Sequence, residues 1–312
     1  MACGDRLCEL PGWTTSTAGV PLTLHPGKVG FLGPRGTFTE EALRSSLGVE
    51  VGEEAGRGLE LLPYPSLQDT IEAVSQDEVP LVLVPIENSI EGSVSITVDI
   101  LAHEVDNLQI VREIQQPIRH RLVARPGVRF EEIERVVSHP HANAQCRQWL
   151  RKHLPGVEAV AANSTASAVQ QVTSTDRPWA AIGTALAAEA FGGVVLRENI
   201  EDHDDNETRF VFLSQVRERQ DLREPYKTSV VCEISKDQPG ALLLILQEFA
   251  YRFINLTKIE SRPSKRMLGE YVFLVDMEGK VNDPQIEDCL RCLTCKLPGL
   301  KVLGSYPVGR PV

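Results

Sequence analysis

The 312-residue sequence lacks a hydrophobic run long enough to cross a membrane, since no stretch approaches about 18 consecutive apolar residues. Its first residues include Asp5 and Glu9 and no apolar segment typical of a signal peptide. It also lacks basic excess, because 32 Lys and Arg stand against 43 Asp and Glu, a net charge of −11. Nucleic acid is disfavoured as a partner, since phosphate binding needs a clustered basic surface. These absences predict a cytoplasmic protein with neither membrane nor nucleic-acid partners.

Signatures of disulfides, metals and nucleotides are missing too. The seven cysteines are odd in number and scattered, which indicates reduced thiols. Cys289, Cys292 and Cys295 have the spacing that opens an iron–sulfur motif, but no fourth cysteine follows and all three share a predicted helix. We therefore predict small helix residues there, and neither a metal nor a cofactor. The glycine turn at 33–36 is not G-x-G-x-x-G or a P-loop, so no nucleotide is implied.

What the sequence contains is an alternation of short apolar strands and helices from residue 28 to about 215. This alternation predicts an α/β domain with a mostly parallel sheet. Its repetition suggests two lobes, in which the strands Val194–Glu198 and Phe210–Leu213 return to the first lobe. After a charged linker the pattern becomes β-α-β-β-α-β, the ferredoxin-like arrangement. The expected division is a leader at 1–27, lobes at roughly 28–106 plus 192–215 and 107–191, a linker at 216–226, and a C-terminal domain at 227–308.

The first turn of the α/β part is a candidate anion site. Strand Lys28–Leu32 runs into a glycine-containing turn and a helix predicted from Glu40, with Thr39 as its N-cap. Free backbone N–H groups at a helix N-terminus favour anions. Gly36 and Thr37 are therefore candidate substrate-binding residues.

Polar side chains also follow the apolar strand Leu81–Ile86. Glu87, Asn88 and Ser89 bring a carboxylate, an amide and a hydroxyl to the end of a strand, where ligand sites gather in α/β sheets. The alternative is a simple capping turn before the next helix. Thr165, at the start of a later helix, has the same two interpretations.

The segment Asn206–Leu213 combines polar, charged and apolar side chains in an unusual order. Thr208 offers a hydroxyl and Arg209 a guanidinium, while Phe210 begins a run typical of a buried strand. A solvated loop leading into a strand is the simpler interpretation. An arginine at a strand edge suits bidentate binding of a carboxylate, which is the functional interpretation.

Taken together, these segments resemble the prephenate dehydratase family with a C-terminal regulatory ACT domain. The resemblance covers about residues 28–308, and its strength lies in the order and spacing of the motifs. They are G-P-R-G-T-F-T-E-E-A at 33–42, V-P-I-E-N-S at 84–89, S-H-P-H-A-N-A-Q-C at 138–146, N-S-T-A-S-A at 163–168, T-R-F-V at 208–211, G-A-L at 240–242 and E-S-R-P at 260–263.

The resemblance implies a two-lobed dehydratase domain similar to periplasmic binding proteins, which converts prephenate to phenylpyruvate. It implies that ACT domains pair between subunits, in a homodimer or homotetramer, and that phenylalanine bound there inhibits the enzyme. The family's essential threonine matches Thr208, with Glu87, Asn88 and Gln145 as further catalytic residues. Substrate contacts are expected from Arg209, Phe210, Ser89, Thr165, Gly36 and Thr37. Phenylalanine contacts are expected from Gly240, Ala241, Leu242, Glu260, Ser261, Arg262 and Pro263.

Several alternatives stay open at this point. Glu87 acts as an acid if burial protonates it, or orients Asn88 or Arg209 if ionised, and the second role is favoured beside a dianionic substrate. The substrate is prephenate or its amino analogue arogenate. A non-catalytic sensor of an aromatic acid is the rival from another class. The C-terminal domain is either an effector site or simply a dimerisation module.

Overall fold

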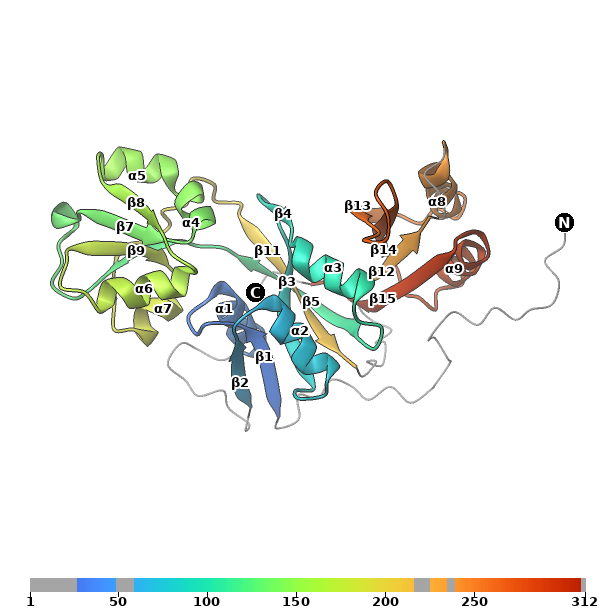
Figure 1. Cartoon of the computed structure of the whole chain (residues 1–312), viewed down its shortest axis with the longest axis horizontal. Helices are drawn as coiled ribbons and strands as arrows, with labels where there is room; N and C mark the ends of the chain where they lie inside the picture. Colours follow the sequence, from blue (N-terminus) through green and yellow to red (C-terminus); the bar gives the residue numbers. More distant parts are fainter. Residues whose placement is uncertain (1–26, 49–58, 216–224, 235–238, 310–312) are drawn as a thin grey trace. The chain divides into compact units, whose positions relative to one another are not determined.

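The computed structural model describes residues 27–48, 59–215, 225–234 and 239–309 (Figure 1). The expected leader and most of the expected linker fall outside these residues. The described chain forms two compact units, one within 27–97 and 114–211 and the other within 98–113 and 212–309. None of its described helices has the length and apolar character needed to span a membrane.

The first sheet carries the strands that precede the polar motifs. Its order is β2-β1-β3-β11-β5, with β4 paired to β3. Strand β1 is parallel to β2 and β3, whereas β4 is antiparallel to β3, so the sheet is mixed. The elements are β1 (Lys28–Leu32), α1 (Phe38–Leu47), β2 (Glu60–Tyr64), α2 (Leu67–Ser75), β3 (Leu81–Asn88), β4 (Gly92–Ser93), α3 (Ser95–His103), β5 (Gln109–Pro117) and β11 (Glu207–Ser214).

Helix α1 begins earlier than the sequence predicts. Its N-cap is Thr37, whose hydroxyl accepts a hydrogen bond from the backbone N–H of Glu40, and not Thr39. Gly36 adopts a φ of 82°, so the tight turn is complete one residue before the cap. Both threonines suit capping, and the end of the turn decides between them.

The second sheet has the order β10-β6-β9-β7-β8 and is also mixed. Strand β7 is parallel to β8 and β9, while β6 is antiparallel to β9 and β10. The elements are β6 (Arg121–Ala124), η1 (Phe130–Glu132), β7 (Arg135–Ser138), α4 (Pro140–Gln145), α5 (Arg147–His153), β8 (Glu158–Ala161), α6 (Thr165–Thr173), β9 (Trp179–Gly183), α7 (Ala185–Ala190) and β10 (Val194–Arg197).

Both faces of this second sheet are covered by helices. Leu122 and Ile182 pack with Ala142 of α4, whereas their neighbours Val123 and Ala181 pack with α6 and α7. Alternate strand residues point to opposite faces, so each strand contributes to both cores. The continuous apolar character of these strands follows from that double burial.

The sheets divide the chain differently from the expected lobes. Strand β10 pairs with β6 in the second sheet and does not return to the first, while β5 belongs to the first sheet. Only β11 returns, as expected. Strand propensity identifies such segments, but pairing depends on long-range contacts that propensity does not encode.

The C-terminal segment folds as β-α-β-β-α-β, the order predicted from the sequence. Its antiparallel sheet has the order β13-β14-β12-β15, and residues of α8 and α9 pack with one face in a common core. Cys289 of α9 is buried in that core, while Cys292 is half-buried and Cys295 is exposed. The elements are β12 (Tyr226–Glu233), α8 (Ala241–Ala250), β13 (Leu256–Pro263), β14 (Tyr271–Glu278), α9 (Pro284–Lys296) and β15 (Gly299–Pro307).

Charged pairs connect this sheet to the β5 and α3 residues of the same unit. The Lys227 ammonium lies 2.9 Å from one carboxylate oxygen of Glu113, which is buried. Arg262 of β13 donates through Nε to Asp99 of α3 at 2.9 Å. Breaking a buried pair leaves an uncompensated charge, so the Lys227–Glu113 contact in particular stabilises the packing of the sheet on this segment.

Candidate functional site

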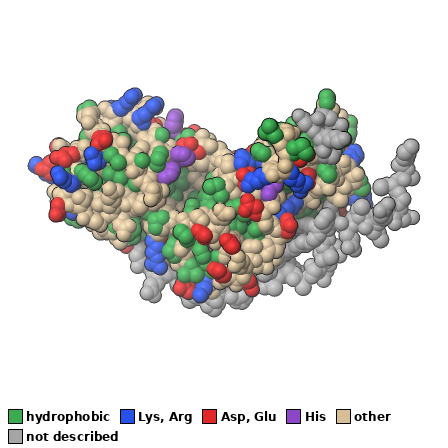
Figure 2. Space-filling model, in the orientation of Figure 1, with side chains coloured by type: hydrophobic (Ala, Val, Ile, Leu, Met, Phe, Trp, Pro, Cys, Tyr) green, Lys and Arg blue, Asp and Glu red, His purple; other side chains and the backbone are tan. Residues whose placement is uncertain are grey.

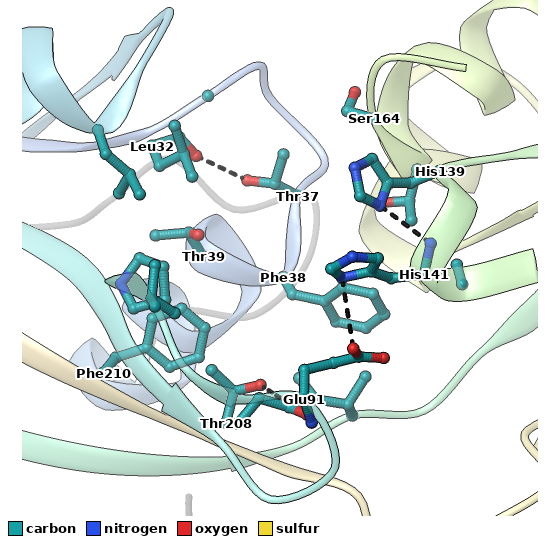
Figure 3. Close-up of a pocket in the computed structure, with 18 of the residues that line it drawn as sticks. Leu32, Thr37, Phe38, Thr39, Glu91, His139, His141, Ser164, Thr208 and Phe210 are labelled. Atoms are coloured by element: carbon teal, nitrogen blue, oxygen red, sulfur yellow. Dashed lines mark hydrogen bonds and ion pairs between the residues drawn. The ribbon is translucent and has the colours of Figure 1, made fainter. Parts of the chain in front are cut away.

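A cavity of about 1110 Å³ lies in the unit that contains both α/β sheets. Around the first sheet, the cavity is lined by the turn after β1, the segment that joins β3 to α3, and β11. Around the second sheet, it is lined by residues at the starts of α4 and α6. Figure 3 shows Thr208 and Phe210 on one side and His139 and Ser164 on another.

Strand alternation decides which motif residues reach the cavity. Thr208 and Phe210 of β11 line it, whereas Arg209 between them does not. On β3, Asn88 lines it and Glu87 does not. The Arg209 guanidinium instead lies 3.3 Å from the Glu87 carboxylate. Because neighbouring strand residues point to opposite faces, the two charged residues pair on the side away from the cavity.

Asn88 and Thr208 are in direct contact. The Asn88 Oδ1 atom accepts hydrogen bonds from the backbone N–H groups of Ile90 and Glu91 at 3.0 and 2.9 Å. Its Nδ2 atom therefore donates to the Thr208 Oγ1 atom at 2.9 Å. Since Thr208 accepts this bond, its own hydroxyl proton remains available for another acceptor.

Gln145 ends α4 and lines the cavity. Its Oε1 atom lies 2.9 Å from His120 Nε2 and 3.1 Å from Asn206 Nδ2, and its Nε2 atom donates to Glu91. The sequence alone assigned no individual role to His120, Asn206 or Glu91, although it singled out the segment that begins at Asn206. The only signal was a histidine before an apolar strand and an asparagine before the T-R-F motif, and each is common by itself.

Two histidines that line the cavity, His120 and His139, are held towards their neutral forms. Burial lowers the pKa of His120, although its contact with Gln145 and the carboxylate of Glu201 oppose this shift. Partial burial, then the neighbouring His141, lowers the pKa of His139. His141 lies 4.0 Å from Glu91. Exposed histidine side chains appear on the face drawn in Figure 2.

One N–H group of the predicted anion site at the first turn, that of Gly36, is already paired with a side chain of the protein. The backbone N–H of Gly36 donates to the Glu40 carboxylate at 2.7 Å. Gly36 packs against Ala187, which a Cβ would approach to 2.9 Å, and does not line the cavity. Thr37 does line it. The glycine at this turn thus serves close packing.

Thr165 and Ser89 have different placements. Thr165 lines the cavity, at the start of α6 and next to the N-cap Ser164. The Ser89 hydroxyl accepts from the backbone N–H of Glu207 at 3.0 Å, and Ser89 is not among the described residues that line the cavity. It holds the loop before β11, so it supports Thr208 from a distance.

The described cavity lining contains neither lysine nor arginine, and Glu91 is its one carboxylate. The N-terminal residues of α1, α3 and α6 line it instead. A helix N-terminus carries partial positive charge and unpaired N–H groups, so it favours an anion. The described residues also include no group of three His, Cys, Asp or Glu side chains suited to a metal.

The expected effector residues lie on two elements of the C-terminal fold, the start of α8 and the strand β13. Gly240 is the N-cap of α8, followed by Ala241 and the partly exposed Leu242. On β13, Ser261 and Pro263 are exposed, while the half-buried Glu260 and Arg262 alternate with them. The guanidinium of Arg262 lies 3.6 Å from Glu260 and 2.9 Å from Asp99.

Comparison with known proteins agrees with this geometry. The family model for prephenate dehydratase matches residues 29–218. A prephenate dehydratase of Methanocaldococcus jannaschii is 42% identical over 277 residues, which cover 88% of this chain and 96% of that protein. The crystal structure of the Arthrobacter aurescens prephenate dehydratase with L-Phe has a TM-score of 0.81 and 39% identity, over 91% of this chain and 92% of that one.

Another solved structure of this shape is described as GqqA, a quorum-quenching acylase. It has a TM-score of 0.76 and 30% identity, and covers 90% of this chain and 98% of its own. The family match nevertheless spans more than half of the chain and includes the motifs that line the cavity. The chain therefore belongs to the prephenate dehydratase family.

Proposed function

We propose that this chain converts prephenate to phenylpyruvate as a cytoplasmic enzyme of phenylalanine biosynthesis. Residues 28–215 would form the catalytic domain, with two lobes similar to periplasmic binding proteins. Residues 227–308 would form an ACT domain. The observation that carries the proposal is the Asn88–Thr208 contact inside a cavity of the matched region.

The reaction sets clear demands on such a site. The bond between the ring and its carboxylate breaks, and its electron pair forms a ring double bond as carbon dioxide leaves. The ring C–O bond breaks at the opposite carbon, and the departing hydroxide takes up one proton to become water. The site must hold two carboxylates, keep water out and stabilise charge on the departing oxygen.

Thr208 is suited to the last of these demands. Asn88 donates to its oxygen, so the Thr208 hydroxyl proton can be directed at the departing oxygen of the substrate. A threonine is a poor general acid, and we assign it hydrogen-bond donation and charge stabilisation. Gln145 would add a second donor, and Phe210 an apolar wall.

The substrate carboxylates would be held by neutral donors and helix N-termini. Thr37 and Thr165 lie at the starts of α1 and α6 and line the cavity, which supports contacts with them. Arg209 pairs with Glu87 on the side of β3 and β11 that faces away from the cavity. This pair supports an orienting role for both residues. A carboxylate contact from Arg209 is not needed in this arrangement.

An acylase activity fits the site less well. Hydrolysis of an amide needs an activated nucleophile, usually a hydroxyl beside a basic side chain. The Thr208 hydroxyl contacts the amide of Asn88 instead. The geometry thus favours a role in which Thr208 donates a hydrogen bond.

Phenylalanine is the proposed effector, supported by the L-Phe complex of the related Arthrobacter aurescens structure. We assign its contacts to Gly240–Leu242 and Glu260–Pro263, between the ACT domains of two copies in a homodimer or homotetramer. The helix N-terminus at Gly240 suits the carboxylate and Glu260 suits the ammonium.

The test is phenylpyruvate formation from prephenate by the wild-type chain, Thr208→Ala and Thr208→Ser, with arogenate in parallel. Loss of the hydroxyl in Thr208→Ala should lower kcat by about 10²–10³-fold. Thr208→Ser keeps the hydroxyl and should retain most of the rate. Equal rates for wild type and Thr208→Ala would refute the role of Thr208. Turnover of arogenate alone would reassign the substrate, and tight prephenate binding without turnover would indicate a sensor.

A further inference from the structure

The side-chain amides around Thr208 have orientations that can be deduced from the backbone. The N–H groups of Ile90 and Glu91 can only donate, and both contact the same end of the Asn88 amide. That end must be the oxygen, Oδ1. The other end, Nδ2, therefore carries both donor protons of Asn88.

The orientation of the Asn88 amide determines the orientations of two more side-chain amides, those of Asn206 and Gln145. Asn88 Nδ2 donates to Asn206 Oδ1 at 2.8 Å, so the Asn206 nitrogen points the other way. Asn206 Nδ2 donates to Gln145 Oε1 at 3.1 Å. The Gln145 nitrogen is then turned towards Glu91, 3.2 Å away.

The last side chain in this series of hydrogen bonds is His120. Its Nε2 atom lies 2.9 Å from Gln145 Oε1, which can only accept, so Nε2 must carry the proton. His120 is 2% exposed, and its Nδ1 atom has no hydrogen-bond partner among the described residues. Among the described residues the Nε2 contact is the ring's one side-chain hydrogen bond, so it fixes the orientation of the ring.

We propose that His120 and Asn206 are positioning residues for the reaction proposed above. They hold the Gln145 oxygen away from the substrate, so that its N–H group and the Thr208 hydroxyl remain the donors at the cavity. Neither residue needs to touch the substrate. This inference rests on the proposed dehydratase function, because it concerns the same cavity.

The simpler alternative is that His120 and Asn206 only fill buried space. Asn206 is 0% exposed, and its backbone carbonyl accepts a hydrogen bond from Ile118, so it has a structural role as well. The two interpretations differ in what an apolar replacement does. If the residue only fills space, an apolar replacement should leave kcat unchanged. If it is a positioning residue, the replacement removes its hydrogen-bond donor and should lower kcat.

The test compares His120→Leu with His120→Gln by kcat, KM and Tm. Glutamine can bring an amide N–H near the place of Nε2, and we expect its kcat to stay within about 3-fold of wild type. Leucine fills similar space without a donor. Its kcat should fall by about 10–100-fold with a smaller change in KM, as expected when a buried hydrogen bond is lost. Its Tm should stay near that of wild type, because a buried polar ring is removed.

A second variant isolates the step between Asn206 and Gln145. Asn206→Asp can still accept from Asn88 but cannot donate to Gln145, so its kcat should also fall by about 10-fold or more. An active wild type with undiminished kcat in both His120→Leu and Asn206→Asp would overturn the positioning role. If the wild type turns over no prephenate, the proposed function fails instead. The ¹⁵N chemical shifts of His120 would then test the inference directly, since protonation at Nδ1 would refute it.

Discussion

At the scale of single residues, Thr208 and Arg209 differ in role because they are neighbours on a strand. The motif alone suggested that both contact the substrate. In the structure Thr208 faces the cavity and Arg209 pairs with Glu87 on the other side. The alternation was readable in the sequence, but the face that borders a cavity depends on what packs against each side. A direct substrate contact from Arg209 therefore remains a prediction that this placement does not support.

A pH dependence of stability follows from His120. Its pKa is lowered by burial, so the folded state favours the neutral ring. Below about pH 6.5 the unfolded chain binds a proton that the folded chain does not. Stability from this group is present above pH 6.5 and is lost as the pH falls through the lowered pKa. Urea unfolding at pH 7.5, 6.5 and 5.5 should give a falling free energy of unfolding, by at most about 1.4 kcal/mol per pH unit from this site.

The control for that measurement is His120→Gln, which has no titratable ring. Its free energy of unfolding should fall less over the same range. His139 has a pKa shifted in the same direction and contributes to the remaining slope. Identical slopes for the two proteins would contradict the assignment to His120.

At the scale of elements, the turn between β1 and α1 depends on Gly36. Its φ is 82°, and a Cβ would lie 2.9 Å from the Cα atom of Ala187 in α7. Gly36→Ala should lower the free energy of unfolding by about 2–4 kcal/mol, because backbone strain and overpacking add. Gly127 has a φ of 92° with open space around it, so Gly127→Ala should cost only about 1–2 kcal/mol. Equal losses in urea unfolding would show that contact with α7 does not matter.

Helix α3 carries residues with two different environments. Ser95 and Ile96 line the cavity, while Asp99 pairs with Arg262 of β13. Given that Arg262 lies in the proposed effector segment, we expect Asp99→Asn to raise the phenylalanine concentration for half-inhibition. A coupling of about 1–3 kcal/mol corresponds to about 5–150-fold. The basal rate should change by less than about 2-fold.

Glu104, the residue directly after α3, provides the matched control. It forms an ion pair with Lys265 at 3.3 Å, and both side chains are well exposed. An exposed pair contributes little, so Glu104→Gln should leave inhibition nearly unchanged. A similar shift in both variants would mean that general charge near α3, rather than the Asp99–Arg262 pair, affects inhibition.

At the scale of the whole molecule, the C-terminal part exposes apolar side chains on α8 and on β13, which is an edge strand. Leu243 is 56% exposed and Ile259 is 46% exposed, with Leu242 and Leu244 beside Leu243. Exposed apolar area and an unpaired strand edge are typical of an interface. This surface supports the proposed homo-oligomer.

Charging that surface should separate the subunits. We expect Leu243→Lys and Ile259→Lys each to shift the mass measured by light scattering towards the monomer, and to weaken phenylalanine inhibition while turnover persists. Val194 of β10 is 45% exposed and lies in the second sheet, so Val194→Lys should keep the oligomer. A monomeric wild type would contradict the proposal directly.

The sequence by itself determined the alternation of strands and helices, the β-α-β-β-α-β order at the C-terminus, and the motifs that identify the family. These features are local, since they depend on period, capping residues and short spacings. The tertiary structure decided that β10 stays with β6, that Glu40 occupies the first turn, and that Arg209 faces away from the cavity. It also brought His120, Gln145 and Asn206 together from positions 25 and 61 residues apart. Contacts over such separations depend on how whole elements pack, and no local pattern in the chain encodes them.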